Sequence, residues 1–388
     1  MKTAIYFEWL HFKRNVARPI AVLLFLAAAI FGLYNGFSNY NERFNQIEAI
    51  RTQVAETQQS AYDWLEQGKS GPEVRPWVNI KEPFWSMWYA THYVINEPAP
   101  NMIFNVGQSD HFGYCKRVSM WTTAFDSDLT AELSNPEMVQ LGALDFSFIW
   151  LYLMPLLLIV LTYHTKGLEM DLGFLPLLQV QQPNLNAWLI QRLAVIGTGV
   201  AGVLTVFMIA SLIGVSSVSL GTEVILLWSI YILYLVLWLA VLYFIIRFGK
   251  GQADQALKMV GAWLLLTVVI PGSVNQYVLL QKPADLMMDM IEANRNGQSE
   301  IYDRPKIDII KEVKLMMPEL SSMEVSKADS LLTQDMIDGA YRLVLNDYMT
   351  KVSNRIMNDQ KERNKVVEGT YWFNPVTGFH NWLKNSTG

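Results

Sequence analysis

Long uncharged segments constrain this 388-residue chain more than any other feature of its sequence. Four of them are long enough, as helices, to cross a hydrocarbon core of about 30 Å. They are Pro19 to Phe37, Phe146 to Tyr163, Leu193 to Gly214 and Val224 to Ile246. A fifth segment, starting near Met259, loses its apolar character at Pro271, so we expect it either to span with a break or to re-enter. The sequence therefore predicts a mainly α-helical, polytopic membrane protein with about five transmembrane helices.

The composition excludes two other classes of protein. The formal net charge of -5 arises from 30 basic and 35 acidic residues, which leaves no basic footprint for nucleic acid. Cys115 is the single cysteine, so no intramolecular disulfide framework can form. We expect Cys115 to be an ordinary buried side chain, and the polar parts of the chain to be held together by packing alone.

Basic residues in the short connections predict the orientation, because these residues stay on the cytoplasmic side. The connections on one side of the membrane are rich in lysine and arginine: Lys2, Lys13, Arg14, Arg18, Lys166, Arg192, Arg247, Lys250 and Lys258. The short connection from Val215 to Glu223, on the other side, has none. We therefore expect a multi-pass protein of the bacterial inner membrane with a cytoplasmic N-terminus.

This orientation divides the chain into four parts. Residues 1–37 hold an N-terminal segment and the first transmembrane helix, and residues 146–280 hold helices two to five. Residues 38–145 are predicted to form an extracytoplasmic domain of mixed helical and irregular structure, and residues 281–388 a second, mainly helical one. In the N-terminal segment, Ile5, Trp9, Phe12 and Val16 share one helical face. Such a helix either lies in the inner membrane interface or extends the first transmembrane helix into the cytoplasm.

No segment carries a catalytic or nucleotide-binding motif. Gly68-Lys69-Ser70 ends like a phosphate-binding loop, but Asp63 stands where that loop requires its first glycine. The predicted spans also lack charged residues in their apolar centres, where ion-coupled carriers usually place them. We therefore expect a non-catalytic chain without cofactor or metal, with any ATP handled by a partner.

The predicted cytoplasmic loop 164–187 is the natural place for energy to enter. Leu168, Leu172, Leu175 and Leu178 form an apolar stripe, with Glu169 and Asp171 early in the segment. A short amphipathic helix of this kind can dock into a groove of a partner protein. The alternative is a connector that lies in the membrane interface and binds nothing.

Several short stretches resemble one family of membrane proteins. They are Pro98 to Val118 with its Gly-x-Ser-Asp turn at 107–110, Asn135 to Leu158, Asp171 to Pro183, and Asn374 to Asn381. Together they are similar to the permease subunits of ABC-2-type exporters, in the subgroup with large extracytoplasmic domains after the first and fifth helices. Two features depart from that family: Pro176 interrupts the loop segment, and no sixth span follows residue 280. Either the chain is truncated after Gly388, or the last helix is missing or replaced by a partner.

The resemblance implies a function for the 164–187 loop. Asp171, Gly173 and Leu175 match the family's acidic-x-Gly-x-Leu coupling segment. Leu175 and Leu178 are expected to enter a groove of the ATPase, with Glu169 or Asp171 facing basic groups at the rim of that groove.

The implied protein is the permease subunit of an ATP-driven ABC exporter of the inner membrane. Its partners would be an ABC ATPase dimer that holds ATP and Mg, a second or related permease, and the lipid bilayer. One alternative is mechanotransmission, in which the ATPase moves the outer domains against a periplasmic or outer-membrane protein without passage of a substrate. Another is a membrane-anchored scaffold that binds no ATPase.

Overall fold

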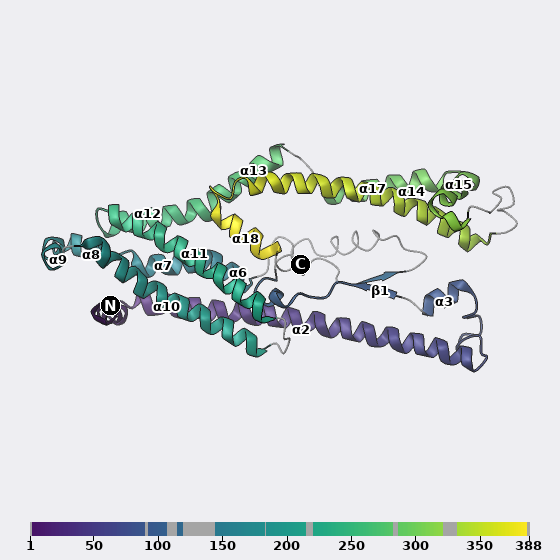
Figure 1. Cartoon of the computed structure of the whole chain (residues 1–388), viewed down its shortest axis with the longest axis horizontal. Helices are drawn as coiled ribbons and strands as arrows, with labels where there is room; N and C mark the ends of the chain where they lie inside the picture. Colours follow the sequence, from purple (N-terminus) through teal and green to yellow (C-terminus); the bar gives the residue numbers. More distant parts are fainter. Residues whose placement is uncertain are drawn as a thin grey trace.

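The computed structural model describes most of the chain: residues 2–89, 92–106, 115–118, 144–182, 184–214, 220–281, 286–320 and 332–385. The fold is almost entirely helical, and five of the described helices are long and apolar enough to cross a membrane. The predicted class, a mainly α polytopic membrane protein with five spans, is confirmed. The molecule is elongated, with the spans toward one end and two long arms reaching toward the other (Figure 1).

The first span belongs to an unusually long helix. After the short helix α1 (Lys2–Arg14), α2 runs without interruption from Ala17 to Glu66. Its 50 residues correspond to about 75 Å at 1.5 Å per residue, far more than the hydrocarbon core needs. The apolar N-terminal part of α2 packs among the other spans, and its polar C-terminal part forms the spine of the first arm. An apolar stripe in the sequence predicts that the helix continues beyond the first span, and the structure confirms it. The residues of the stripe are Tyr40, Phe44, Ile47, Val54, Ala61 and Leu65.

The second and fifth spans each contain a proline preceded by a π-helical turn. In the second span, α6 (Phe146–Phe148) leads through the π turn η3 (Ile149–Leu153) into α7 (Met154–Thr162). In the fifth, α12 (Gln252–Leu264) leads through η4 (Leu265–Val269) into α13 (Ile270–Gln281). A wider turn relieves the clash between a proline ring and the carbonyl four residues earlier. The break expected near Pro271 is therefore a bulge in a helix that continues.

The third and fourth spans are the long helices α10 (Leu185–Gly214) and α11 (Leu220–Phe248), which pack against each other. Aromatic side chains fill the centre of the span bundle. Trp150 and Tyr231 are completely buried and meet edge to face, and Phe146 stacks on Trp150. Such pairs add free energy beyond the apolar area that they bury.

The first arm combines the outer part of α2 with short elements: α3 (Pro83–Tyr89), β1 (His92–Ile95), the 3-10 turn η1 (Pro100–Ile103) and β2 (Cys115–Val118). The two strands pair antiparallel, with Ile95 opposite Cys115. The turn η1 lies directly on α2, because Gly36 has no side chain there; a Cβ at Gly36 would lie 1.8 Å from the carbonyl oxygen of Ile103. This contact fixes the base of the arm to the first span.

The second arm is a helical hairpin with its own small core. Helices α14 (Leu286–Tyr302) and α15 (Lys306–Met316) pack along α17 (Gln334–Glu368), and the 3-10 turn η5 is Pro318–Leu320. The final helix, α18 (Pro375–Asn385), turns back to the spans, where Phe379 meets Tyr234 of α11. Both arms extend toward the same end of the molecule, opposite α1 (Figure 1). We call these two ends the arm end and the loop end.

Candidate coupling site

The 164–187 loop lies at the loop end and folds as two short helices rather than one (Figure 1). Helix α8 spans Gly167–Asp171 and α9 spans Leu175–Gln181. They are separated at Gly173, whose φ of 75° is a left-handed conformation that glycine adopts without strain. Pro176 lies in the first turn of α9, where its missing N–H is not needed. The proline therefore begins a helix and does not disrupt the segment.

Glu169 does not face outward as expected. Its Oε1 accepts a hydrogen bond from Nη1 of Arg192 on α10, at 2.7 Å, and its side chain is only 19% exposed. Within this chain the basic partner of Glu169 is therefore Arg192, and the expectation that Glu169 or Asp171 faces basic groups of a partner stays a prediction. The pair ties the 164–187 loop to the third span.

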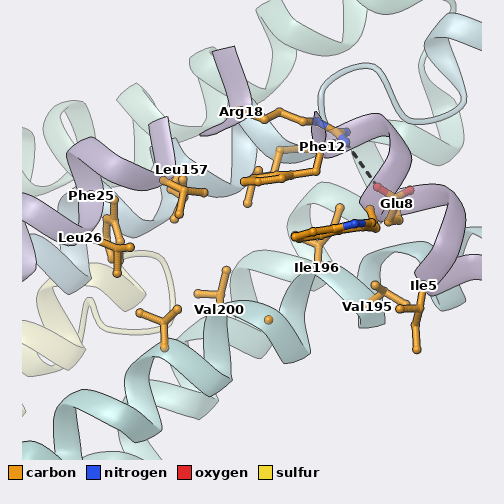
Figure 2. A pocket seen from close by; sticks show the side chains of 15 residues that line it. Ile5, Glu8, Phe12, Arg18, Phe25, Leu26, Leu157, Val195, Ile196 and Val200 are labelled. Carbon is orange, nitrogen blue, oxygen red and sulfur yellow. Dashed lines mark hydrogen bonds and ion pairs between the residues drawn. The ribbon is translucent and has the colours of Figure 1, made fainter. Parts of the chain in front are cut away.

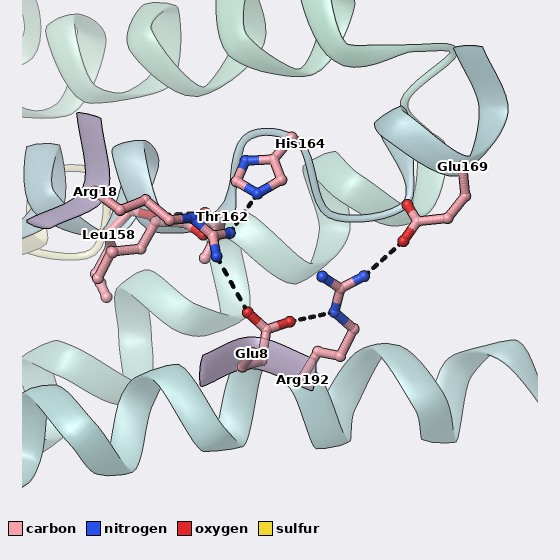
Figure 3. Close-up of polar contacts among 8 residues, drawn as sticks. Glu8, Arg18, Leu158, Thr162, His164, Glu169 and Arg192 are labelled. Carbon is pink, nitrogen blue, oxygen red and sulfur yellow. Dashed lines mark hydrogen bonds and ion pairs between the residues drawn. The ribbon is translucent and has the colours of Figure 1, made fainter. Parts of the chain in front are cut away.

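Glu8 extends this contact into a network of buried charges (Figure 3). Its Oε1 accepts from Nε of Arg192, and its Oε2 pairs with Arg18 at 3.5 Å. Arg18 in turn donates to the carbonyl oxygen of Leu161 at 2.6 Å and contacts Nε2 of His164. The network thus joins α1, the start of α2, the end of α7, α8 and the start of α10.

The network is buried as well as charged. The side chains of Glu8, Arg18 and Arg192 are 7%, 2% and 8% exposed. The positive charges of two arginines balance the negative charges of two glutamates. This pairing offsets the free-energy cost of removing the charges from water, but only while every partner is in place. Burial and the nearby Arg192 guanidinium lower the pKa of His11, so this neighbour on α1 is neutral at pH 7.

A second set of polar contacts joins the 164–187 loop to the connection between the fourth and fifth spans. Oδ2 of Asp171 accepts from the backbone N–H of Gln252 at 3.1 Å, in the first turn of α12. Nζ of Lys166 donates to the carbonyl oxygens of Ile246 at 3.2 Å and Arg247 at 2.6 Å, at the end of α11. A displacement of this segment would therefore reach the third, fourth and fifth spans through direct contacts, and the first span through Arg192 and Glu8.

The apolar surface of the loop also differs from the expected one. Leu175 and Leu178 are half-buried and so only partly available to a partner. Four other side chains are much more exposed: Leu172 at 57%, Phe174 at 57%, Leu177 at 60% and Val180 at 82%. We call these four residues the apolar loop face. The leucine stripe assumed one continuous helix, and the turn at Gly173 changes which side chains point outward.

Sequence reasoning missed the buried network because it treated Arg18 and Arg192 only as orientation signals. One signal was present, since Glu8 is the sole acidic residue before Glu42 and lies within a basic segment. A lone carboxylate of this kind indicates a partner for a nearby arginine. The residues that pair across the fold could not be read from spacing, because they are up to 184 positions apart.

No cluster of metal-ligating side chains occurs within the described ranges. Cys115 is half-buried in β2, and burial raises the pKa of its thiol. The Gly-x-Ser-Asp turn at 107–110 and residues 135–143 lie outside the described part of the chain. No family model, no curated protein and no solved structure matches this chain.

Proposed function

We propose that this chain is the permease subunit of an ATP-driven exporter of the ABC-2 type, and that a separate ATPase binds its 164–187 loop. The observation that carries the proposal is the apolar loop face: Leu172 and Phe174 lie in the turn between α8 and α9, Leu177 and Val180 lie on α9, and all four side chains are exposed at the loop end. Exposed apolar side chains grouped on a helix are typical of a surface that enters a partner's groove. The resemblance of Asp171, Gly173 and Leu175 to the family's coupling segment supports the same assignment.

The contacts of the loop support a mechanical role. Closure of an ATPase dimer, which holds ATP and Mg, would push α8 and α9 along the membrane normal. The pair of Glu169 with Arg192 and the pair of Glu8 with Arg18 would carry that displacement to the third and first spans. The bond from Gln252 to Asp171 would carry it to the fifth span. The permease supplies the pathway and the lever, and the ATPase supplies the chemistry.

In this proposal the loop end lies in the cytoplasm of a bacterium, and both arms lie outside the inner membrane. The excess of lysine and arginine in the connections at the loop end supports this orientation. A second copy of this chain, or a related permease, would complete the pathway.

A second candidate function, mechanotransmission, is favoured by one specific feature. Helix α2 runs unbroken from Ala17, beside the buried network, to Glu66 at the arm end. A rigid helix of about 75 Å could convert a movement of Arg18 into a movement of the arm. In that case the arm would act on a periplasmic or outer-membrane protein, and no substrate would cross the span bundle.

The test replaces Leu172 and Leu177 together by Asp, which puts two charges onto the apolar loop face. An ABC ATPase that co-purifies with the wild-type chain should no longer co-purify with the double variant in detergent, because the charges would have to be buried. The matched control is Val74→Asp with Leu315→Asp, at two apolar residues of the arms that are 87% and 86% exposed. The control should keep the ATPase bound.

Three results separate the alternatives. If the ATPase still binds the Leu172→Asp, Leu177→Asp variant, the loop is only a connector. Failure of the wild-type chain to capture any ATPase would favour a scaffold. ATP-dependent movement of the arms in proteoliposomes that transport nothing would favour mechanotransmission over export.

A further inference from the structure

An apolar cavity of about 290 Å³ lies between α1 and the span bundle. Ile5 and Phe12 of α1 and Val195, Ile196 and Val200 of α10 line it, with Phe12 across the cavity from Val200 (Figure 2). Helices α2 and α7 line the rest of the cavity. Apart from Glu8 and Arg18 at one end, every described residue that lines the cavity is apolar. The occupant must therefore be a hydrocarbon with little need for hydrogen bonds.

The cavity is continuous with the lipid-facing surface of the protein. Three of the four helices that line it, α2, α7 and α10, belong to membrane spans. The side chains of Ile5 and Trp9, on α1, are 50% and 56% exposed although they line it. On α10, Ile190 is 54% exposed and lies one to two turns from the lining residues. An acyl chain of the surrounding bilayer can therefore enter from the side without crossing a polar barrier.

The charges beside the cavity identify the headgroup. Glu8 and Arg18 are already paired with each other. Lys13 and Arg14, at the end of α1, are exposed, and no acidic side chain in the described part of the chain pairs with them. Nζ of Lys13 lies 4.9 Å from the ring centre of Trp9, which lines the cavity. Unpaired basic groups on an amphipathic interfacial helix attract anionic lipid headgroups.

We propose that this cavity is a binding site for an anionic glycerophospholipid from the leaflet on the α1 side of the membrane. One acyl chain lies between α1 and α10, and the phosphate group meets Lys13 and Arg14. Because α1 also carries Glu8, which binds Arg192, the lipid holds α1 in the position that the buried network requires. The proposal does not depend on the ATPase, and its test contains none.

The first experiment fills the cavity with an added side chain. A Cβ at Gly199, which lines the cavity, would meet no atom within 4 Å, so Gly199→Leu adds its side chain to open space. Gly202 is three residues further along α10, has equally open surroundings and does not line the cavity, which makes Gly202→Leu the matched control. Both variants should fold, as circular dichroism and gel filtration will verify.

The full-length protein is reconstituted with phosphatidylglycerol that carries a diazirine in one acyl chain, and the labelled peptides are mapped after irradiation. We expect labels on α1 and on the 195–203 segment of α10. Loss of burial for about two methylene groups weakens binding roughly tenfold, so labelling should fall by about that factor in Gly199→Leu. Labelling in Gly202→Leu should equal that of the wild type. Equal labelling of the two variants would overturn the site.

The second experiment tests the lipid headgroup. Unlabelled phosphatidylglycerol should compete with the probe better than phosphatidylcholine does. The double variant Lys13→Gln, Arg14→Gln should reduce this preference for phosphatidylglycerol on the order of tenfold. The control is the double variant Lys361→Gln, Lys365→Gln, at two exposed residues of α17, which should leave the preference for phosphatidylglycerol unchanged. Equal competition by both lipids in the wild type would contradict an anionic headgroup. Capture of another protein by a photoreactive amino acid at Phe12 would assign the cavity to a protein partner and overturn the proposal.

Discussion

Glu8 joins three helices because its two carboxylate oxygens serve different arginines. Oε2 pairs with Arg18 of α2 and Oε1 with Arg192 of α10, while Glu8 itself belongs to α1. Loss of the Glu8 carboxylate would therefore leave two buried guanidinium groups with less negative charge beside them. Removal of one partner from a buried ion pair destabilises a protein much more than the pair itself stabilises it.

Glu8→Gln should lower the free energy of unfolding by about 3–5 kcal/mol, because the neutral amide cannot balance two guanidinium groups that are almost fully buried. The measurement is equilibrium unfolding in mixed micelles of mild detergent and SDS. Glu42→Gln, at an exposed carboxylate of α2, is the control and should change the free energy by less than about 0.5 kcal/mol. A similar small effect for both variants would show that the network contributes little.

At the scale of elements, the π turn in the second span receives donors from two neighbouring helices. Pro155 cannot donate to the carbonyl oxygen of Leu151, four residues earlier, and the hydroxyl of Tyr234 on α11 donates to it at 2.7 Å. The indole N–H of Trp263 on α12 donates to the next carbonyl, that of Tyr152, at 3.1 Å. Within a bilayer no water can replace these donors, so the bulge also fixes how α7, α11 and α12 pack.

Tyr234→Phe should cost about 0.6–1.7 kcal/mol, the range measured for hydrogen bonds between membrane helices. Thermal unfolding in detergent, followed by circular dichroism, measures the change. Tyr243→Phe makes the same chemical change on the same helix, where the hydroxyl only accepts from exposed Arg247. The control should unfold like the wild type; a Tyr234→Phe variant that does the same would mean that the Leu151 carbonyl finds another donor.

The elements differ in how well the sequence predicts them. The spans and the continuation of α2 were predictable, because an uncharged run or an apolar stripe is a local property of the chain. The division of the 164–187 loop was not, because it depends on the conformation of Gly173 and on the pairing of Glu169 with Arg192. Contacts between distant residues decide both, and one sequence without relatives does not reveal them.

At the scale of the whole molecule, charge and shape separate the two ends. The loop end carries α1, α8, α9 and the start of α12, while the outer half of α2 and the hairpin of α14, α15 and α17 form the arm end (Figure 1). Because the two arms follow the first and fifth spans, an odd number of crossings precedes each of them. Both arms must then lie on one side of the membrane, and the basic connections predict that this side is not the cytoplasm.

Cysteine labelling tests this arrangement in whole cells. The background is Cys115→Ser, which should assemble normally because Cys115 is half-buried and has no disulfide partner, and burial raises the pKa of its thiol. Single cysteines then replace three exposed residues: Ala55 on α2, Leu315 on α15 and Val180 on α9. With the outer membrane permeabilised, a membrane-impermeant maleimide should label the variants at Ala55 and Leu315, and the variant at Val180 only after lysis.

Labelling of Val180 before lysis, with Ala55 and Leu315 protected, would invert the topology and place the apolar loop face where no ATPase can reach it. Labelling of only one arm would mean that the fifth helix does not cross the membrane.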